Sequence, residues 1–190
     1  MSLAGLRFAD PDVLTLDEAA EVFDGSTVPT LVDLKDPRDA EAVANWLAQR
    51  SDPERWAICT DDLSALQVAR DRAPDVQRWR SLPHVAPGRG EGVRRIAACA
   101  LRSTLPARLR RLVEEAGATA LSVDRWAVTP RLCAAAHALG VEVAAWTVNT
   151  ERSARRMSAC GADFITTDRP EEMQAALASQ DGTATARCDG

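Results

Sequence analysis

The sequence is poor in side chains that commonly move protons in enzymes. It has no tyrosine and only two histidines, His84 and His137. His137 lies in the apolar pattern "AAAHALG", which favours a structural place in a helix. His84 follows an expected strand and Pro83, which favours an ordinary loop residue over a group near the strand ends. General acid–base chemistry therefore has few candidates in this chain.

Paired cysteines and long apolar runs are also absent. The five cysteines are widely spaced and form no CxxC pair, which disfavours a cysteine zinc site and fits reduced thiols. No apolar run approaches the roughly 18 residues that a membrane span requires. Residues 1–13 lack the charged and apolar regions of a secretory signal. We therefore expect a cytoplasmic protein with no membrane span.

The charge balance argues against a nucleic-acid partner. The net charge is −5, whereas a nucleic-acid-binding domain usually presents a basic face. The arginine-rich stretch 107–111, "ARLRR", is followed at once by Glu114 and Glu115. This mixture predicts a solvated helix face rather than a binding patch.

Strand-like and helix-like segments alternate along the chain. Strands are predicted at 30–35, 55–60, 76–82, 118–124, 141–148 and 162–168, and a helix at 14–23 precedes the first of them. Helical patterns lie between the strands, for example from Leu105 to Val113. Such alternation predicts an α/β fold with a parallel sheet, either open and doubly wound or part of a (β/α)₈ barrel. The absence of GxGxxG and Walker motifs disfavours nucleotide-binding sheets. Residues 1–177 are the expected domain, and the polar segment 178–190 is expected to be a disordered tail.

The stretch "PTLVDLKDP", 29–37, contains the only lysine among 23 lysine and arginine residues. Alternation along a strand places Leu31, Asp33 and Lys35 on one face, which would be the inner face at the mouth of a barrel. A carboxylate and an ammonium there are costly unless they bind a ligand or each other. Two interpretations remain open. Asp33 binds a divalent metal and Lys35 a phosphate oxygen, or the two form an ion pair and Asp36 caps the next helix. The single lysine favours the first slightly, because its compact ammonium differs from the planar fork of arginine.

Further polar residues follow the other expected strands. Parallel strands bring their carboxyl ends to one face, where barrel enzymes build their sites. Residues of the type of Asp61, Asp124 and Asp168 more often cap helices than bind ligands. Trp146 is either a substrate platform or part of the core. The candidates are Thr60, Asp61, Asp62, Asp124, Trp146, Asn149, Thr167 and Asp168.

These segments resemble the glycerophosphodiester phosphodiesterase family. "TLDEAAEVF" followed by "TLVDLKDP" is similar to the helix and the Glu-x-Lys strand of that family. Residues 141–173, "VEVAAWTVNTERSARRMSACGADFITTDRPEEM", resemble its last two units, including "WTVN" and "GxDxIxTDxP". The resemblance runs in the same order over residues 14–173.

The resemblance implies a metal-dependent phosphoric diester hydrolase on a (β/α)₈ barrel. Such enzymes act in lipid and glycerophosphodiester metabolism and release sn-glycerol 3-phosphate and an alcohol. By this match Asp33 replaces a glutamate that binds the divalent metal, Ca²⁺ or Mg²⁺. Lys35 matches a substrate-facing lysine, and Trp146 the tryptophan that lines the pocket.

The sequence also departs from the family pattern. It lacks His-Arg-Gly, Glu-x-Asp and a later His-Asp pair, so no residue of the chain matches a catalytic histidine of the family. We expect a partial TIM-type barrel of about six parallel βα units without the first two strands. We also expect an N-terminally truncated gene product or a mis-assigned start, with impaired hydrolysis. Strands 30–35 and 162–168 would then be open edges, which favour self-association.

Three functional hypotheses follow. The chain is a family hydrolase that is complete only with further residues, or a non-catalytic module that binds a small glycerophosphodiester. Alternatively, it is an unrelated α/β domain without a site at the strand ends.

Overall fold

The computed structural model of the chain describes residues 12–23, 27–85, 88 and 90–185. The chain divides into two compact units, Met1–Thr30 and Leu31–Gly190. In the first, α2 (Leu16–Glu21) lies within the helix predicted at 14–23. It begins with a capping box, in which the Thr15 hydroxyl accepts from the Glu18 amide and the Glu18 carboxylate accepts from the Thr15 amide.

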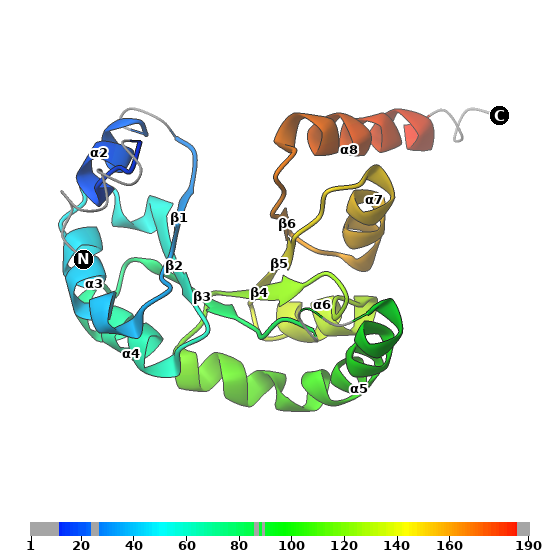
Figure 1. Ribbon diagram of the computed structural model, residues 1–190, viewed down its shortest axis with the longest axis horizontal. Helices are drawn as coiled ribbons and strands as arrows, with labels where there is room; N and C mark the ends of the chain where they lie inside the picture. The colour runs from blue at the N-terminus through cyan, green and yellow to red at the C-terminus, as the bar shows by residue number, and fades with distance from the viewer. Residues whose placement is uncertain (1–11, 24–26, 86–87, 89, 186–190) are drawn as a thin grey trace. The chain divides into compact units, whose positions relative to one another are not determined.

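Six strands follow the predicted order and form one sheet of parallel strands (Figure 1). They are β1 (Thr30–Asp33), β2 (Trp56–Thr60), β3 (Gln77–Ser81), β4 (Ala120–Asp124), β5 (Glu142–Trp146) and β6 (Phe164–Ile165). Each strand neighbours the next in sequence, so the sheet curls as part of a TIM-type barrel. Among the described strands, β1 and β6 each have one neighbour, which confirms the prediction of an incomplete ring with two edges.

Helices connect the strands. They are η1 (Pro37–Asp39), α3 (Ala40–Ala48), η2 (Pro53–Arg55), α4 (Leu63–Arg72), α5 (Glu91–Ala116), α6 (Pro130–His137), α7 (Glu151–Cys160) and α8 (Pro170–Thr185). Two differ from the sequence prediction. The helix expected from Leu105 begins at Glu91 and carries Pro106 inside it. Helix α8 continues through Thr185, past the domain boundary expected at 177, and residues 186–190 lie outside the described part.

The two faces of the sheet bury different side chains. Val123, Val143 and Ala145 belong to the main apolar cluster, which also contains helix residues such as Leu109 and Leu132. The opposite, inner face has a separate cluster of Ala57, Cys59, Trp79, Ala120 and Ala144. Most of these inner residues are small. The rings of Trp79 and Phe164 meet across this face with centroids 5.0 Å apart. The small side chains leave space above them, toward the carboxyl ends of the strands.

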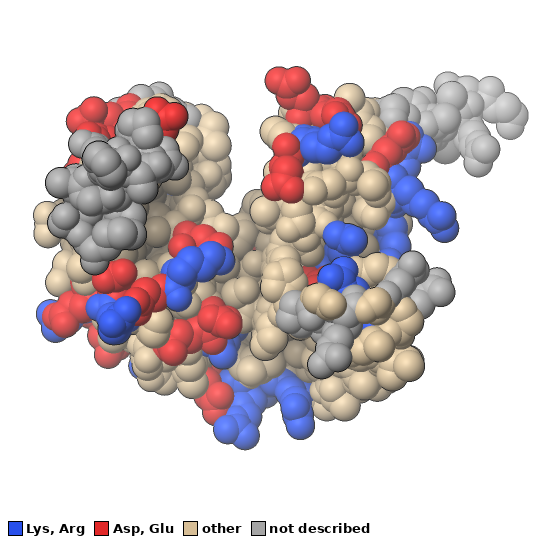
Figure 2. Space-filling model, in the orientation of Figure 1, with Lys and Arg blue, Asp and Glu red and all other residues tan. Residues whose placement is uncertain are grey.

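The surface mixes both signs of charge. Figure 2 shows acidic and basic side chains interspersed, with basic side chains gathered at the lower edge over α5. Arg110 and Arg111 pair with Glu114 and Glu115, one helical turn further along, which confirms the predicted solvated face. Within the described residues, no helix combines the length and the apolar character needed to cross a bilayer.

Gly161 ends α7 in the left-handed conformation, with φ at 85°. An added Cβ would lie 3.5 Å from Cys133 Cβ, an ordinary contact, so the cost of a side chain is backbone strain. We expect Gly161→Ala to lower the free energy of unfolding by about 1 kcal/mol or more. Gly92→Ala is the matched control, because Gly92 lies inside α5 with open space around it. It should be neutral or stabilising by about 0.5 kcal/mol. Equal midpoints of urea unfolding for the two variants would contradict this account.

Candidate functional site

Buried polar side chains identify one end of the sheet. Among the described residues, the buried polar or charged side chains are Thr60, Ser122 and Asp124. All three lie at or near the carboxyl ends of β2 and β4. Burying such groups away from a partner costs free energy, so their gathering at one edge marks a candidate site.

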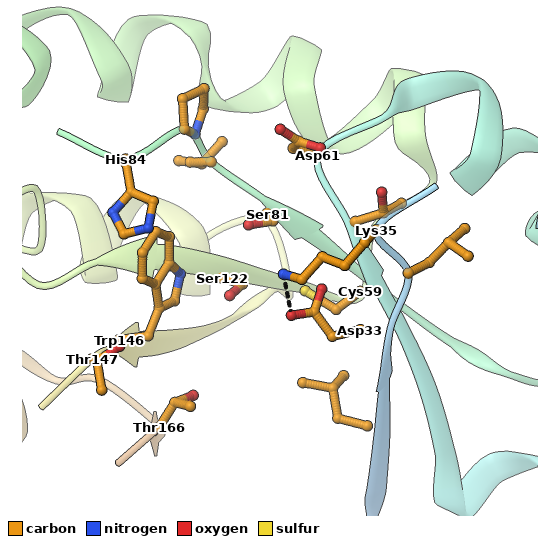
Figure 3. Close-up of a pocket in the computed structure, with 15 residues that line it drawn as sticks. Asp33, Lys35, Cys59, Asp61, Ser81, His84, Ser122, Trp146, Thr147 and Thr166 are labelled. Atoms are coloured by element: carbon orange, nitrogen blue, oxygen red, sulfur yellow. Dashed lines mark ion pairs between the residues drawn. The ribbon is translucent and has the colours of Figure 1, made fainter. Parts of the chain in front are cut away.

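A cavity of about 520 Å³ opens at this edge (Figure 3). Polar side chains line several of its sides. Each of the six strands contributes to the lining, either by a residue of the strand or by one that directly follows it. Its lining comprises Leu31, Asp33, Leu34, Lys35, Cys59, Thr60, Asp61, Ser81, Leu82, Pro83, His84, Ser122, Trp146, Thr147 and Thr166. The structure thus brings Asp33, Lys35 and Trp146 to one cavity, the position that the sequence predicted for them.

Asp33 and Lys35 form an ion pair inside this lining. Lys35 lies just past the end of β1, which stops at Asp33 rather than continuing to 35 as expected. The Lys35 Nζ and Asp33 Oδ2 atoms are 2.5 Å apart, and the hydrogen bond to Asp33 raises the pKa of Lys35. Asp36 caps η1 by accepting from the Arg38 amide, and its hydrogen bonds to Arg38 lower its pKa to about 2. The ion pair and the cap of the second interpretation are therefore both present, while Lys35 still faces the cavity.

Trp146 lies across the cavity from Lys35 (Figure 3). Its indole Nε1 is buried and has no hydrogen-bond partner among the described residues. The Arg125 amide donates to the carbonyl of Trp146, and the Arg125 guanidinium donates to the carbonyl of Thr147. These bonds hold the end of β5 in place. An unpaired buried donor beside a cavity is a group that a ligand oxygen would satisfy.

His84 lies at the rim of the same cavity. Its ring packs edge-on against Trp146, with centroids 4.3 Å apart and planes at 86°. Its Nδ1 atom is 3.5 Å from Asp124 Oδ2. The sequence favours an ordinary loop residue at this position, whereas the structure places His84 in the lining of the cavity.

Cys59, Ser81 and Ser122 line the cavity and were not predicted. Burial raises the pKa of the Cys59 thiol to about 11, although its hydrogen bond with Ser122 acts in the opposite direction. Each occupies an inward position near its strand end, two residues after Ala57, Trp79 and Ala120 respectively. Residues two apart in a strand share a face, so this spacing could have identified the three residues from the sequence.

Other predicted strand-end residues lie outside the cavity lining. Asp62 caps α4 by accepting from the Ala65 amide. Asn149 donates to the Asp168 carboxylate, and its side-chain oxygen accepts from the Thr167 hydroxyl. Asp62 therefore serves as a helix cap, whereas Asn149, Thr167 and Asp168 bond to one another after β5 and β6.

The described residues do not fit a divalent metal by themselves. They contain no group of three histidine, cysteine, aspartate or glutamate side chains placed to hold a metal ion. The carboxylate of Asp33 is already engaged with Lys35. Ca²⁺ and Mg²⁺ prefer several oxygen ligands, so one paired carboxylate is insufficient.

Comparison with known proteins assigns the family. The model of the "Glycerophosphoryl diester phosphodiesterase family" matches residues 16–172, which is most of the chain. The chain belongs to the glycerophosphoryl diester phosphodiesterase family. The resemblance noted in the sequence is therefore confirmed.

Solved structures of similar fold agree with this family assignment. A phosphodiesterase from Oleispira antarctica, solved with the product sn-glycerol-3-phosphate, is 20% identical with a TM-score of 0.66. It is matched over 86% of this chain and 60% of its own. A Silicibacter pomeroyi protein assigned as a glycerophosphoryl diester phosphodiesterase is 28% identical with a TM-score of 0.54, over 80% of this chain and 50% of its own.

A third structure, an Agrobacterium tumefaciens protein with the same type of assignment, is 18% identical with a TM-score of 0.67, over 88% of this chain and 65% of its own. This family member thus spans between half and two thirds of the length of these three structures. None of the curated proteins compared with it matches the chain.

The environment of Cys59 predicts how this family member reacts with thiol reagents. Cys59 is buried and its pKa is raised, whereas Cys99 is exposed. The thiolate is the reactive form, so between pH 7 and 9 we expect iodoacetamide to modify Cys99 at least roughly 10-fold faster than Cys59. Peptide mass spectrometry of a time course measures both rates. Equal rates in the folded protein would show that Cys59 is neither buried nor protonated as described.

Proposed function

We propose that the cavity binds the phosphate group of a glycerophosphodiester and that the chain acts on it as a phosphoric diester hydrolase. One observation carries the proposal: the ammonium of Lys35 and the indole of Trp146 lie on opposite sides of the same cavity, and the indole N–H has no partner among the described residues. The family assignment supports it. The product found in the Oleispira antarctica structure suggests sn-glycerol 3-phosphate as the part of the substrate that is retained.

The lining has the donors that a phosphodiester requires. The ammonium of Lys35 is charged at neutral pH, and its hydrogen bond to Asp33 raises its pKa further, so it can attract an anionic phosphate. The hydroxyls of Ser81 and Ser122 add neutral donors beside it. Asp33 orients the Lys35 side chain through the ion pair. Its role as a metal ligand stays a prediction, and no chemical step is assigned to a metal here.

Hydrolysis would release sn-glycerol 3-phosphate and an alcohol. We expect slow turnover from this chain, because one histidine lines the cavity and the described residues contain no metal-ligating group of three. The second candidate function is ligand binding without turnover. The absence of a complete metal-ligating group among these residues favours it. Both candidates require phosphate binding by Lys35.

Lys35→Ala tests that shared requirement. In the unmodified chain, sn-glycerol 3-phosphate at about 100 times its Kd should stabilise the fold by about 2.7 kcal/mol. For a chain of this length the melting temperature should then rise by roughly 5–10 °C. Removing a charged hydrogen-bond donor costs about 1.5–3 kcal/mol, so Lys35→Ala should reduce the affinity roughly 10- to 100-fold. At the same ligand concentration this removes about half to about 85% of the stabilisation.

Arg38→Ala is the matched control. Arg38 is a nearby, highly exposed cation that pairs with Asp36 and does not line the cavity. Its variant should keep the full shift. An undiminished shift in Lys35→Ala, or an equal loss in both variants, would reject the proposed site.

A further inference from the structure

His84 lines the cavity and is contacted by two other side chains. It lies against Trp146 and Asp124, two residues that are directly paired in the ladder between β4 and β5. Figure 3 shows its ring at the rim, next to the indole of Trp146. The ring therefore contacts Trp146 on one side and Asp124 on another, and the His84 side chain is 62% exposed.

Asp124 holds the segment after β3 that contains His84 and Val85. It is 6% exposed, and its carboxylate accepts hydrogen bonds of 3.0 Å from the amides of Val85 and Trp126. Val85 follows His84 directly, so one buried carboxylate contacts both the imidazole and the backbone that carries it. A carboxylate beside Nδ1 of a histidine orients the ring.

Two other titratable groups of the cavity, Lys35 and Cys59, keep their protons near neutral pH. The pKa of Lys35 is raised by Asp33, and the pKa of Cys59 is raised to about 11 by burial. Neither group can release and regain a proton readily in that range. Histidine is the side chain that enzymes use most often for proton transfer, and among the described residues that line the cavity His84 is the only histidine.

We propose that His84, positioned by Asp124, donates the proton to the departing alkoxide when a phosphodiester bound in the cavity is hydrolysed. The inference rests on the proposed function. A water oxygen attacks phosphorus, and the bond between phosphorus and the alcohol oxygen breaks with its electron pair on that oxygen. Nε2 of His84, the nitrogen turned away from Asp124, gives its proton to this oxygen. The attacking water loses a proton to solvent, the imidazole regains one, and the products are a phosphate monoester and an alcohol.

The leaving group provides the test. The alkoxide released from glycerophosphoethanolamine needs a proton, whereas the 4-nitrophenolate released from bis(4-nitrophenyl) phosphate does not. General acid catalysis contributes about 10²- to 10⁴-fold, so His84→Asn should lower kcat/KM for the first substrate by that factor. For the second substrate we expect a loss of less than about 10-fold, because its leaving group departs without a proton and does not need a general acid.

His137→Asn is the matched control. His137 also pairs with an aspartate, 2.9 Å from Asp163, but it lies at the end of α6 and does not line the cavity. Its variant should keep both activities. Asp124→Asn should show the same leaving-group dependence as His84→Asn at smaller amplitude, since Asp124 acts through the position of His84. Melting temperature and binding of sn-glycerol 3-phosphate establish that each variant is folded.

The possible outcomes separate this inference from the proposed function. Equal losses on the two substrates, or no loss on either, would overturn the role of His84. Binding of sn-glycerol 3-phosphate by the unmodified chain without hydrolysis of either substrate would overturn it as well and leave the binding proposal standing. Absence of binding in the unmodified chain would instead reject the proposed function.

Discussion

Parallel pairing of the strands is the constraint on which the site depends. Asp124 is aligned with Trp146, and Ser81 with Ser122, so inward side chains at the same height meet at one edge of the sheet. Small residues below them, Ala120 and Ala144, leave the space that becomes the cavity. A shift of one residue in any strand would turn its inward side chains toward the helices and remove them from the lining.

The segments that follow the strands carry the polar groups at the rim of the cavity. Asp124 ties the segment after β3 to the segment after β4, and Arg125 ties the latter to the end of β5. Through these bonds, residues from three connections surround one opening. Lys35 contributes a fixed positive charge from the other side, with Asp33 as its partner. The cavity therefore offers several hydrogen-bond donors to an anion. The described residues contain no complete set of metal ligands.

Much of this arrangement could be read from the sequence, because it depends on local periodicity. Alternation placed Asp33 and Lys35 on the inner face, and the end of a strand placed Trp146 beside them. Ser81 and Ser122 were missed because small hydroxyl residues occur in many strands without any function. Asn149 was considered for the site, but β5 ends at Trp146, and the chain has turned by Asn149 so that its amide meets Asp168. Helix α5 begins at Glu91 and contains Pro106, so the apolar stripe from Leu105 marks only its second half.

The indole signal of Trp146 provides the most direct test of the central claim, that the carboxyl ends of the strands form an anion-binding cavity. The chain has five tryptophans, so a ¹H–¹⁵N correlation spectrum gives five indole N–H signals, and Trp146→Phe assigns one of them. The unpaired Trp146 Nε1 should acquire an acceptor when sn-glycerol 3-phosphate is added, whereas the Trp79 Nε1 already donates to Gln77. The account predicts a saturable downfield shift of the Trp146 signal that exceeds the shifts of the other four. An unchanged Trp146 signal at a ligand concentration that saturates binding would contradict it.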